Sequence, residues 1–242
     1  MTLQLGLEAG IVRTDGHMYV YKDQGPFPGV TRICGLQDSA GGADGLMNWA
    51  VGLALDTVEA LTKADANWEE VRSAAFQAKN NARDLGSAIH ASVDRFNRHQ
   101  ALGVTDKTAS YVAQYGAFLY NRGVEILGSE KYVINTSVGF GGTYDSLVTI
   151  DGETGPLDVK SGKEKASQRL QLTGLSMGEL HGEPLEEPVP LPPLDDVGFI
   201  LLLRPDGYEL VRHEITQADR DHFTRLVEIY HHVRSWAEGA AA

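Results

Sequence analysis

Hydrophobic residues in the first half of the chain recur every three or four positions over three stretches. The stretches lie at about 46–58, 67–99 and 106–122, and this spacing predicts three amphipathic helices. Before them, residues 17–33 alternate in polarity and contain several prolines and glycines, which predicts an extended segment.

From about residue 128 the pattern changes to short segments rich in β-branched and aromatic residues, separated by glycine-containing turns. The segments EKYVINTSV, TYDSLVTI and GPLDVK predict strands, with a hairpin turn at Asp151–Gly152. A helix is predicted over 167–180. It precedes a proline-rich acidic loop over 181–196, which contains too many prolines for a helix or a strand. A hairpin over 197–215 and a helix that begins at Thr216 complete the pattern.

This order of elements predicts an α/β fold in which a mixed β-sheet core is flanked by helices, with a helical N-terminal half. The change of pattern separates residues 1–127, an extended segment followed by helices, from residues 128–242, the α/β core. A chain of 242 residues suits one integrated domain. The order of the strands is not readable from the sequence.

The composition narrows the class of protein. No apolar run approaches a membrane span, and the first residues do not resemble a signal peptide, so we expect a cytoplasmic protein with no membrane partner. The only cysteine is Cys34, which excludes an intramolecular disulfide and a four-cysteine zinc or iron–sulfur site. The formal net charge of −12 argues against a protein that coats DNA nonspecifically. It argues less against an enzyme in which local cations and a bound metal contact the phosphates.

Two carboxylates and an ammonium group lie on strands that otherwise consist of core residues. Side chains alternate between faces along a strand, so Asp158 and Lys160 share one face of the sheet. If the strands pair across the Asp151–Gly152 turn, Asp145 can lie on that face too. Two close carboxylates are costly to bury without a cation, and Mg²⁺ prefers oxygen ligands. The alternative is an exposed Asp–Lys pair on an edge strand.

Gly86 and His90 are four residues apart on the longest predicted helix, so they share one helix face. The glycine either interrupts the helix or lets another group approach closely, and the histidine one turn later can contact that group. The alternative is a helix glycine followed by a histidine at the border of the apolar stripe.

In their order along the chain, these residues resemble the RecB-type branch of the PD-(D/E)XK nuclease superfamily, and in particular the RecB-like exonucleases encoded by bacteriophages. The motifs are Gly86-x-x-x-His90, Gly142-x-x-Asp145, Asp158-x-Lys160 and Leu170-Gln171. GFGGTYDSLVTIDG and LDVKSGK are similar to two strands of that family, and GPFPGVTRICGLQDS…GLMNWAVGLA is similar to its opening segment. The resemblance covers about Tyr19 to Gln171.

The resemblance implies a restriction-endonuclease-like sheet and a Mg²⁺-dependent deoxyribonuclease, with Mn²⁺ as an alternative metal. Such an enzyme, an exonuclease in these relatives, hydrolyses phosphodiester bonds with a metal-activated water in phage recombination or replication. DNA would be the substrate. A recombinase, a single-strand annealing protein or further copies of the chain would be partners, in the host cytoplasm if the protein is phage-encoded.

The resemblance also implies roles for individual residues. The metal ligands would be Asp145, Asp158, His90 and the backbone carbonyl of Val159. Lys160 would act on the attacking water, and Gln171 would orient Lys160 or a phosphate.

Other charged residues near these motifs have two interpretations. Lys163, Lys165 and Arg169 can contact phosphates of the substrate, or they can lie exposed at the start of a helix. Glu130 can support the site from the preceding strand, but an exposed charge at a strand start is the interpretation we prefer.

The chain also departs from the family pattern. Leu175 stands where the family has a tyrosine, Ser161 replaces a threonine, and the cysteines of the iron–sulfur members are missing. The missing tyrosine and the acidic charge favour an alternative function, a catalytically inactive nuclease-fold accessory or DNA-binding protein in a recombination or packaging complex. The intact aspartates and lysine favour the enzyme. An unrelated α/β enzyme is the weakest hypothesis, because nucleophile-elbow, phosphate-loop and dinucleotide motifs are all missing.

Overall fold

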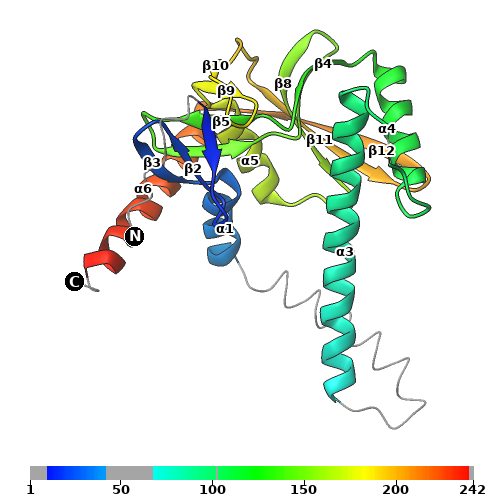
Figure 1. Cartoon of the computed structure of the whole chain (residues 1–242), viewed down its shortest axis with the longest axis horizontal. Helices are drawn as coiled ribbons and strands as arrows, with labels where there is room; N and C mark the ends of the chain where they lie inside the picture. The colour runs from blue at the N-terminus through cyan, green and yellow to red at the C-terminus, as the bar shows by residue number, and fades with distance from the viewer. Residues whose placement is uncertain (1–9, 42–67, 102, 240–242) are drawn as a thin grey trace.

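The computed structural model describes residues 10–41, 68–101 and 103–239, which form five helices and three β-sheets (Figure 1). The fold is therefore mixed α/β, as the hydrophobic pattern predicts. The helix predicted at 46–58 lies outside the described residues. None of the described helices is long and apolar enough to cross a membrane.

The largest sheet has five strands in the order β12-β11-β8-β7-β4. The strands are β4 (Glu125–Ser129), β7 (Ser146–Ile150), β8 (Glu153–Lys160), β11 (Val197–Arg204) and β12 (Gly207–Glu214). The β8–β11 pair is parallel and the other pairs are antiparallel, so the sheet is mixed. The predicted hairpin turn at Asp151–Gly152 is confirmed, and both residues have positive φ, 53° and 84°, as a two-residue type I′ turn requires.

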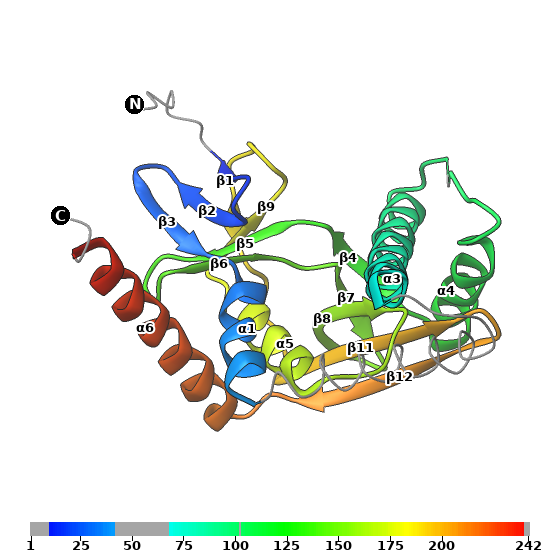
Figure 2. The ribbon, with the colours of Figure 1, turned by 90° about the horizontal axis from the view of Figure 1, so that it is seen from below.

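Two smaller sheets lie beside the five-stranded sheet. One has the order β10-β9-β5-β6 and the other β1-β2-β3. The strands are β1 (Ile11–Arg13), β2 (Met18–Tyr21), β3 (Gln24–Pro28), β5 (Tyr132–Asn135), β6 (Phe140–Thr143), β9 (Leu180–Gly182) and β10 (Val189–Pro190). Figure 2 shows β4 leading into β5 and β6 leading into β7, so two antiparallel segments pass from the five-stranded sheet into the four-stranded sheet.

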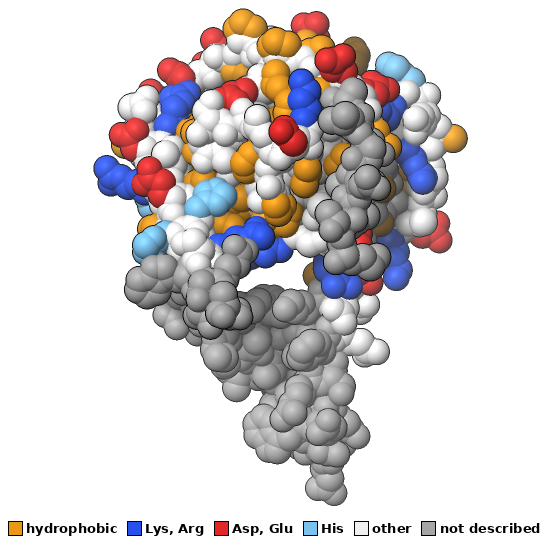
Figure 3. Space-filling view, turned by 60° about the vertical axis from the view of Figure 1, so that its left-hand side comes forward, with side chains coloured by type: hydrophobic (Ala, Val, Ile, Leu, Met, Phe, Trp, Pro, Cys, Tyr) orange, Lys and Arg blue, Asp and Glu red, His pale blue; other side chains and the backbone are white. Residues whose placement is uncertain are grey.

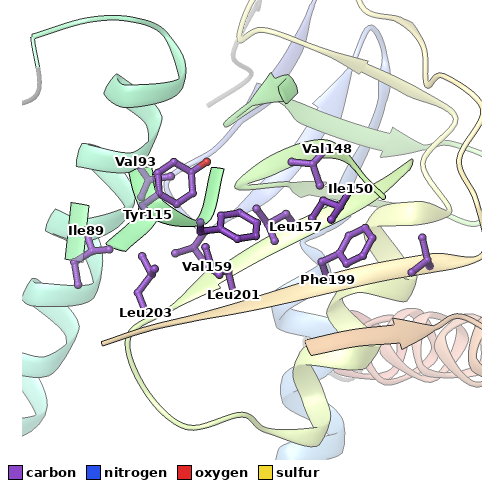
Figure 4. Packing of buried hydrophobic residues seen from close by; sticks show 12 residues of the cluster. Ile89, Val93, Tyr115, Val148, Ile150, Leu157, Val159, Phe199, Leu201 and Leu203 are labelled. Atoms are coloured by element: carbon purple, nitrogen blue, oxygen red, sulfur yellow. The ribbon is translucent and has the colours of Figure 1, made fainter. Parts of the chain in front are cut away.

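The described helices are α1 (Val30–Gly41), α3 (Trp68–Asn97), α4 (Ala109–Arg122), α5 (Ala166–Ser176) and α6 (Gln217–Gly239). Helices α3 and α4 cover one face of the five-stranded sheet, and α5 covers the other. Along β11, Phe199 and Leu201 belong to the core cluster of α3 and α4, whereas Ile200 and Leu202 belong to the cluster of α5 (Figure 4). Burial on both faces explains why this strand is an unbroken apolar run.

A second core cluster joins α1, α5 and α6 to the four-stranded sheet. Its buried side chains include Ile33 of α1, Leu170 of α5, Phe223 of α6 and Phe140 of β6. Both this cluster and the cluster of α3 and α4 combine side chains from before and after residue 128.

Two segments differ from the sequence-based expectation. Helix α1 begins at Val30, inside the segment predicted to be extended, because the carbonyl of Gly29 accepts a hydrogen bond from the N–H of Ile33 and starts a helical turn. The helix predicted over 167–180 ends at Ser176, and the loop predicted over 181–196 contains strand β10 and most of β9 (Leu180–Gly182). The proline of β10, Pro190, is tolerated because β10 is an edge strand.

We expect Phe223→Ala to destabilise the protein by about 3–5 kcal/mol, because it removes a fully buried ring that packs edge-on against Phe140 at 5.0 Å between centroids. The matched control on the same helix is Val233→Ala. Val233 is 61% exposed, so its truncation should change the stability by less than about 0.5 kcal/mol. Urea unfolding measures both, and equal midpoints would show that α6 is not anchored by this ring.

Candidate metal centre

Two carboxylates lie at the junction where the paired segments pass from one sheet to the other. The pairing register of β4–β7 continues unchanged into β5–β6, which places Glu130 opposite Asp145. The N–H of Glu130 donates to the carbonyl of Asp145 at 3.1 Å. We call Glu130 and Asp145 the junction carboxylates.

A third carboxylate extends this row. Ser146 pairs with Leu157 at the end of the β7–β8 ladder, so one further step in register places Asp158 opposite Asp145. Residues opposite one another on neighbouring strands project from the same face of a sheet. The three carboxylates therefore lie in a row in which Asp145, between β6 and β7, stands between Glu130 of the β4–β5 connection and Asp158 of β8.

Helix α3 brings a histidine to the row. His90 Nδ1 lies 3.2 Å from Asp145 Oδ2. The neighbouring side chains Ile89 and Val93 are buried against the five-stranded sheet, and this packing fixes which face of α3 is turned toward the strands. The second partner of the same carboxylate oxygen is the N–H of Val159, which donates to it at 2.7 Å.

His90, Glu130 and Asp145 form a set that could hold a metal ion. One potential ligand atom of each lies within 4.8 Å of those of the other two. One imidazole and two carboxylates suit Mg²⁺ or Mn²⁺ better than a soft metal.

Asp158 lies next to this set and is held by Lys160. The Nζ of Lys160 is 2.6 Å from Asp158 Oδ1, and the aspartate is 1% exposed. Its other oxygen, Oδ2, is buried and has no hydrogen-bond partner among the described residues. A buried carboxylate oxygen without a donor is costly unless a cation approaches it, so this atom also fits a metal site.

The backbone of Val159 can face the same site. Its N–H points toward Asp145, and the N–H and C=O of one strand residue point to the same side of the strand. The carbonyl predicted as a ligand therefore lies on the side of the candidate metal centre.

The charges of these groups shift one another's pKa values. Burial raises the pKa of Glu130 to about 7, and Asp145 adds to this shift. Burial and Asp145 raise the pKa of Asp158 to about 6. Burial also acts to raise the pKa of Asp145, but His90 and Lys160 hold it below its ordinary value. The cluster holds more potential negative charge than its own cations neutralise, and a divalent cation would relieve this imbalance.

A buried polar network connects α3 to the junction. Asn97 Nδ2 donates to Ser129 Oγ at 3.1 Å and to Ser146 Oγ at 3.0 Å, and its Oδ1 accepts from the hydroxyl of Tyr115 at 2.8 Å. Both serines are buried, and each is the chain neighbour of one junction carboxylate. The network therefore holds α3, and with it the histidine, at a set distance from the carboxylates.

Several predicted site residues lie away from this centre. Gln171, on α5, lines a separate small pocket. Arg169 forms an ion pair with Asp219 at 2.8 Å, so its guanidinium group already has a partner within the protein. Lys163 and Lys165 are exposed just before α5. The position where the family has a tyrosine, Leu175, is 2% exposed and belongs to the core of α1, α5 and α6.

The glycine of the predicted helix motif is not required by close packing among the described residues. A Cβ on Gly86 would have a single neighbour within 4 Å, Ser161 Oγ at 3.9 Å. Helix α3 continues through Gly86 without interruption.

Glu130 is a candidate that sequence reasoning ranked below an exposed strand-start charge, whereas the structure half-buries its side chain and places it in the set with His90 and Asp145. The sequence contains a signal for the position of this residue in the hairpin that connects β5 and β6. Counting outward from its turn at 136–139 pairs residue 130 with residue 145, which identifies the glutamate as the neighbour of a predicted ligand.

No protein-family model matches the chain, and a search of curated proteins finds no match.

We expect Glu130→Gln to stabilise the metal-free protein at pH 8 but not at pH 4. The pKa of Glu130 is about 7 in the folded protein against an ordinary 4.5, so the stability of the fold decreases as the pH rises from about 4.5 to 7, and the full loss is present at pH 8. The gain should be on the order of 2 kcal/mol at pH 8, measured by thermal unfolding in EDTA. Mg²⁺ or Mn²⁺ should then raise the melting temperature of the wild type more than that of the variant. A matched control is Glu125→Gln, at an exposed position on β4, and an equal gain at both pH values would contradict the assignment.

We expect Asn97→Ala to cost about 2–3 kcal/mol, because it removes three hydrogen bonds to buried hydroxyl groups. Tyr115→Phe, which removes one hydrogen bond of the same network, should cost about 1 kcal/mol. Chemical unfolding gives both values, and Mn²⁺ titration should show weaker binding to the alanine variant. Unchanged metal affinity would mean that the network does not position the ligands.

Proposed function

We propose that the chain is a metal-dependent deoxyribonuclease of the PD-(D/E)XK type that hydrolyses phosphodiester bonds. The row of carboxylates at the sheet junction, with Lys160 bound to Asp158 and His90 bound to Asp145, carries this proposal. A restriction-endonuclease-like core is part of the proposal, and the mixed sheet with helices on both faces is compatible with it. Exonuclease action and a role in phage recombination or replication rest on the resemblance alone.

The donor set fits a divalent cation. His90, Glu130 and Asp145 would hold it, and the unpartnered Oδ2 of Asp158 and the carbonyl of Val159 would complete its protein ligands. When bound, Mg²⁺ would polarise the phosphate and favour deprotonation of a water molecule.

Lys160 stabilises charge rather than removing a proton. Burial acts to lower its pKa, but the charges of Asp158 and Asp145 raise the pKa above its ordinary value. A lysine that stays protonated is a poor general base and a good partner for the negative charge that develops on a phosphate during hydrolysis. Its bond to Asp158 holds the ammonium group at a fixed position.

His90 and Asp145 form the other ordered pair. Asp145 raises the pKa of the histidine, although burial opposes this, so the proton on the imidazole depends on the carboxylate. A cation bound by both residues would displace that proton, because only the neutral imidazole is a ligand.

The surface charge limits how DNA can be held. Figure 3 shows acidic and basic side chains interspersed over one face of the described residues. In a chain of net charge −12, DNA contacts must come from a few local cations and the metal, so binding should weaken steeply when the metal is removed.

The proposal predicts metal-dependent digestion of DNA. End-labelled linear DNA and circular DNA would be incubated with Mg²⁺, Mn²⁺ or EDTA. Lys160→Ala and Asp158→Asn should each reduce the rate by about 100-fold or more, because the first removes the cation that faces the phosphate and the second removes the charge of a metal ligand that also holds Lys160. Lys107→Ala, at an exposed position before α4, is the control and should retain the wild-type rate.

Loss of linear DNA alone would identify an exonuclease, and cutting of circles an endonuclease. No cleavage with either metal, or cleavage unaffected by both substitutions, would overturn the proposal and favour the catalytically inactive accessory protein.

A further inference from the structure

The five-stranded sheet has two edge strands, which differ in regularity. In β4 the register against β7 shifts between Ile126 and Gly128. The other edge strand, β12, pairs with β11 at all eight of its positions, from Gly207 to Glu214, without a shift. Natural sheets protect open edges with bulges, prolines or short strands, because unpaired N–H and C=O groups there can bind a further strand. None of these three protections is present in β12.

The outer edge of β12 presents a row of backbone groups. The N–H of Ile215 donates to the carbonyl of Asp196 at 2.9 Å, so the backbone groups of Ile215 point toward β11. Because these groups alternate in direction along a strand, odd-numbered residues of β12 point toward β11 and even-numbered residues point outward. The outward-pointing residues are Tyr208, Leu210, Arg212 and Glu214. Among the described residues, no strand pairs with this outer edge (Figure 2).

The side chains of β12 leave apolar surface at this edge on both faces of the sheet. Tyr208 and Leu210 pack on the core cluster of α3 and α4, and Val211 packs on the cluster that contains Leu172 of α5. All three side chains are only half-buried. A further strand at the outer edge would cover the exposed part of each of them.

The sequence of β12 fits a second copy of itself. When two identical strands pair antiparallel and continue one sheet, a twofold axis perpendicular to the sheet sets one residue opposite its own copy. An axis at Glu209 or at Arg212 would place like charges opposite each other, which is unfavourable. An axis at Leu210 would set Glu209 opposite Val211. An axis at Val211 joins the two valines and sets Glu209 of each copy opposite His213 of the other.

The axis at Val211 also suits the outward-pointing backbone groups. It sets Leu210 of each copy opposite Arg212 of the other, and Tyr208 opposite Glu214, so every outward-pointing residue gains a hydrogen-bonding partner.

The groups that would form the cross-strand pair are not fully engaged within one chain. Glu209 lies 3.8 Å from Arg204, and its side chain is 61% exposed. His213 Nε2 lies 2.8 Å from Glu164. The second ring nitrogen of the histidine can therefore serve Glu209 of the other copy.

We propose that two copies of this chain associate by antiparallel pairing of β12, with the twofold axis at Val211, so that their five-stranded sheets become one continuous sheet. The backbone ladder supplies the affinity of this interface. The contacts of Glu209 with His213 select the register. The proposal concerns assembly and does not depend on the nuclease function.

Sedimentation velocity of the full chain over a range of concentrations tests this pairing. The wild type should sediment as a dimer at high concentration. Arg212→Pro removes an outward-pointing N–H and adds a ring at the edge, so it should weaken dimerisation at least about 10-fold. Arg212→Ala is the matched control. It removes the same ion pair with Glu153 but keeps the N–H, and it should dimerise like the wild type.

Cysteine cross-linking tests the position of the axis. Residues that face each other at a non-hydrogen-bonded antiparallel position have Cα atoms about 4.5 Å apart, a separation that a disulfide can span. Val211 would occupy such a position, so Val211→Cys should form a covalent dimer on mild oxidation. Asp206→Cys, exposed at the turn of the same hairpin, would lie far from its copy and should form none. The wild type should form none either, because Cys34 is buried.

A wild type that remains monomeric up to about 100 μM would overturn the proposal. A dimer that is unaffected by Arg212→Pro and leaves Val211→Cys unlinked would overturn it as well. Thermal unfolding would verify that each variant is folded, and cross-linking decides alone if the proline variant is not. Both measurements are made without nucleic acid or metal. A chain that cleaves no DNA can therefore still confirm the pairing, and an active nuclease can still contradict it.

Discussion

The passage of two paired segments from one sheet into another determines where the candidate ligands lie. Glu130 and Asp145 occupy the two crossing points and face each other, because the pairing register does not change across the junction. The β7–β8 ladder ends at the same point. The carboxylate of Asp145 then accepts the N–H of Val159 in place of a strand carbonyl. This hydrogen bond fixes the orientation of the carboxylate at the end of the ladder.

The position of α3 depends on contacts of two kinds. Its apolar face packs on the five-stranded sheet through Ile89 and Val93. Its C-terminal turn is tied to the junction by Asn97 and by Arg98, which donates to the carbonyl of Ser129 at 2.8 Å. The apolar packing sets the distance between α3 and the sheet. The polar contacts set the rotation of α3 about its axis and its position along the sheet. His90 therefore reaches Asp145 as a consequence of packing elsewhere along the helix.

The acidic composition and the proposed substrate are compatible because the relevant charges are local. The candidate metal centre concentrates carboxylates where a cation would neutralise them. Net charge governs long-range attraction to DNA, whereas a buried or confined cluster acts at short range, where water screens it least. A nuclease with this net charge would therefore depend on a bound metal for affinity as well as for chemistry.

The sequence by itself determined the elements and part of the site. Helical and alternating periodicities predicted α3, α4, the β7–β8 hairpin and α6, and alternation along β8 predicted that Asp158 and Lys160 share a face. These features depend on residues close together in the chain. Only the tertiary structure decided that Glu130 joins the ligands and that Gln171 lies with Arg13 and Arg32 in a pocket. The approach of His90 to Glu130 and Asp145, and the packing of the N-terminal hairpin against β6, are contacts between distant segments, which no local pattern encodes.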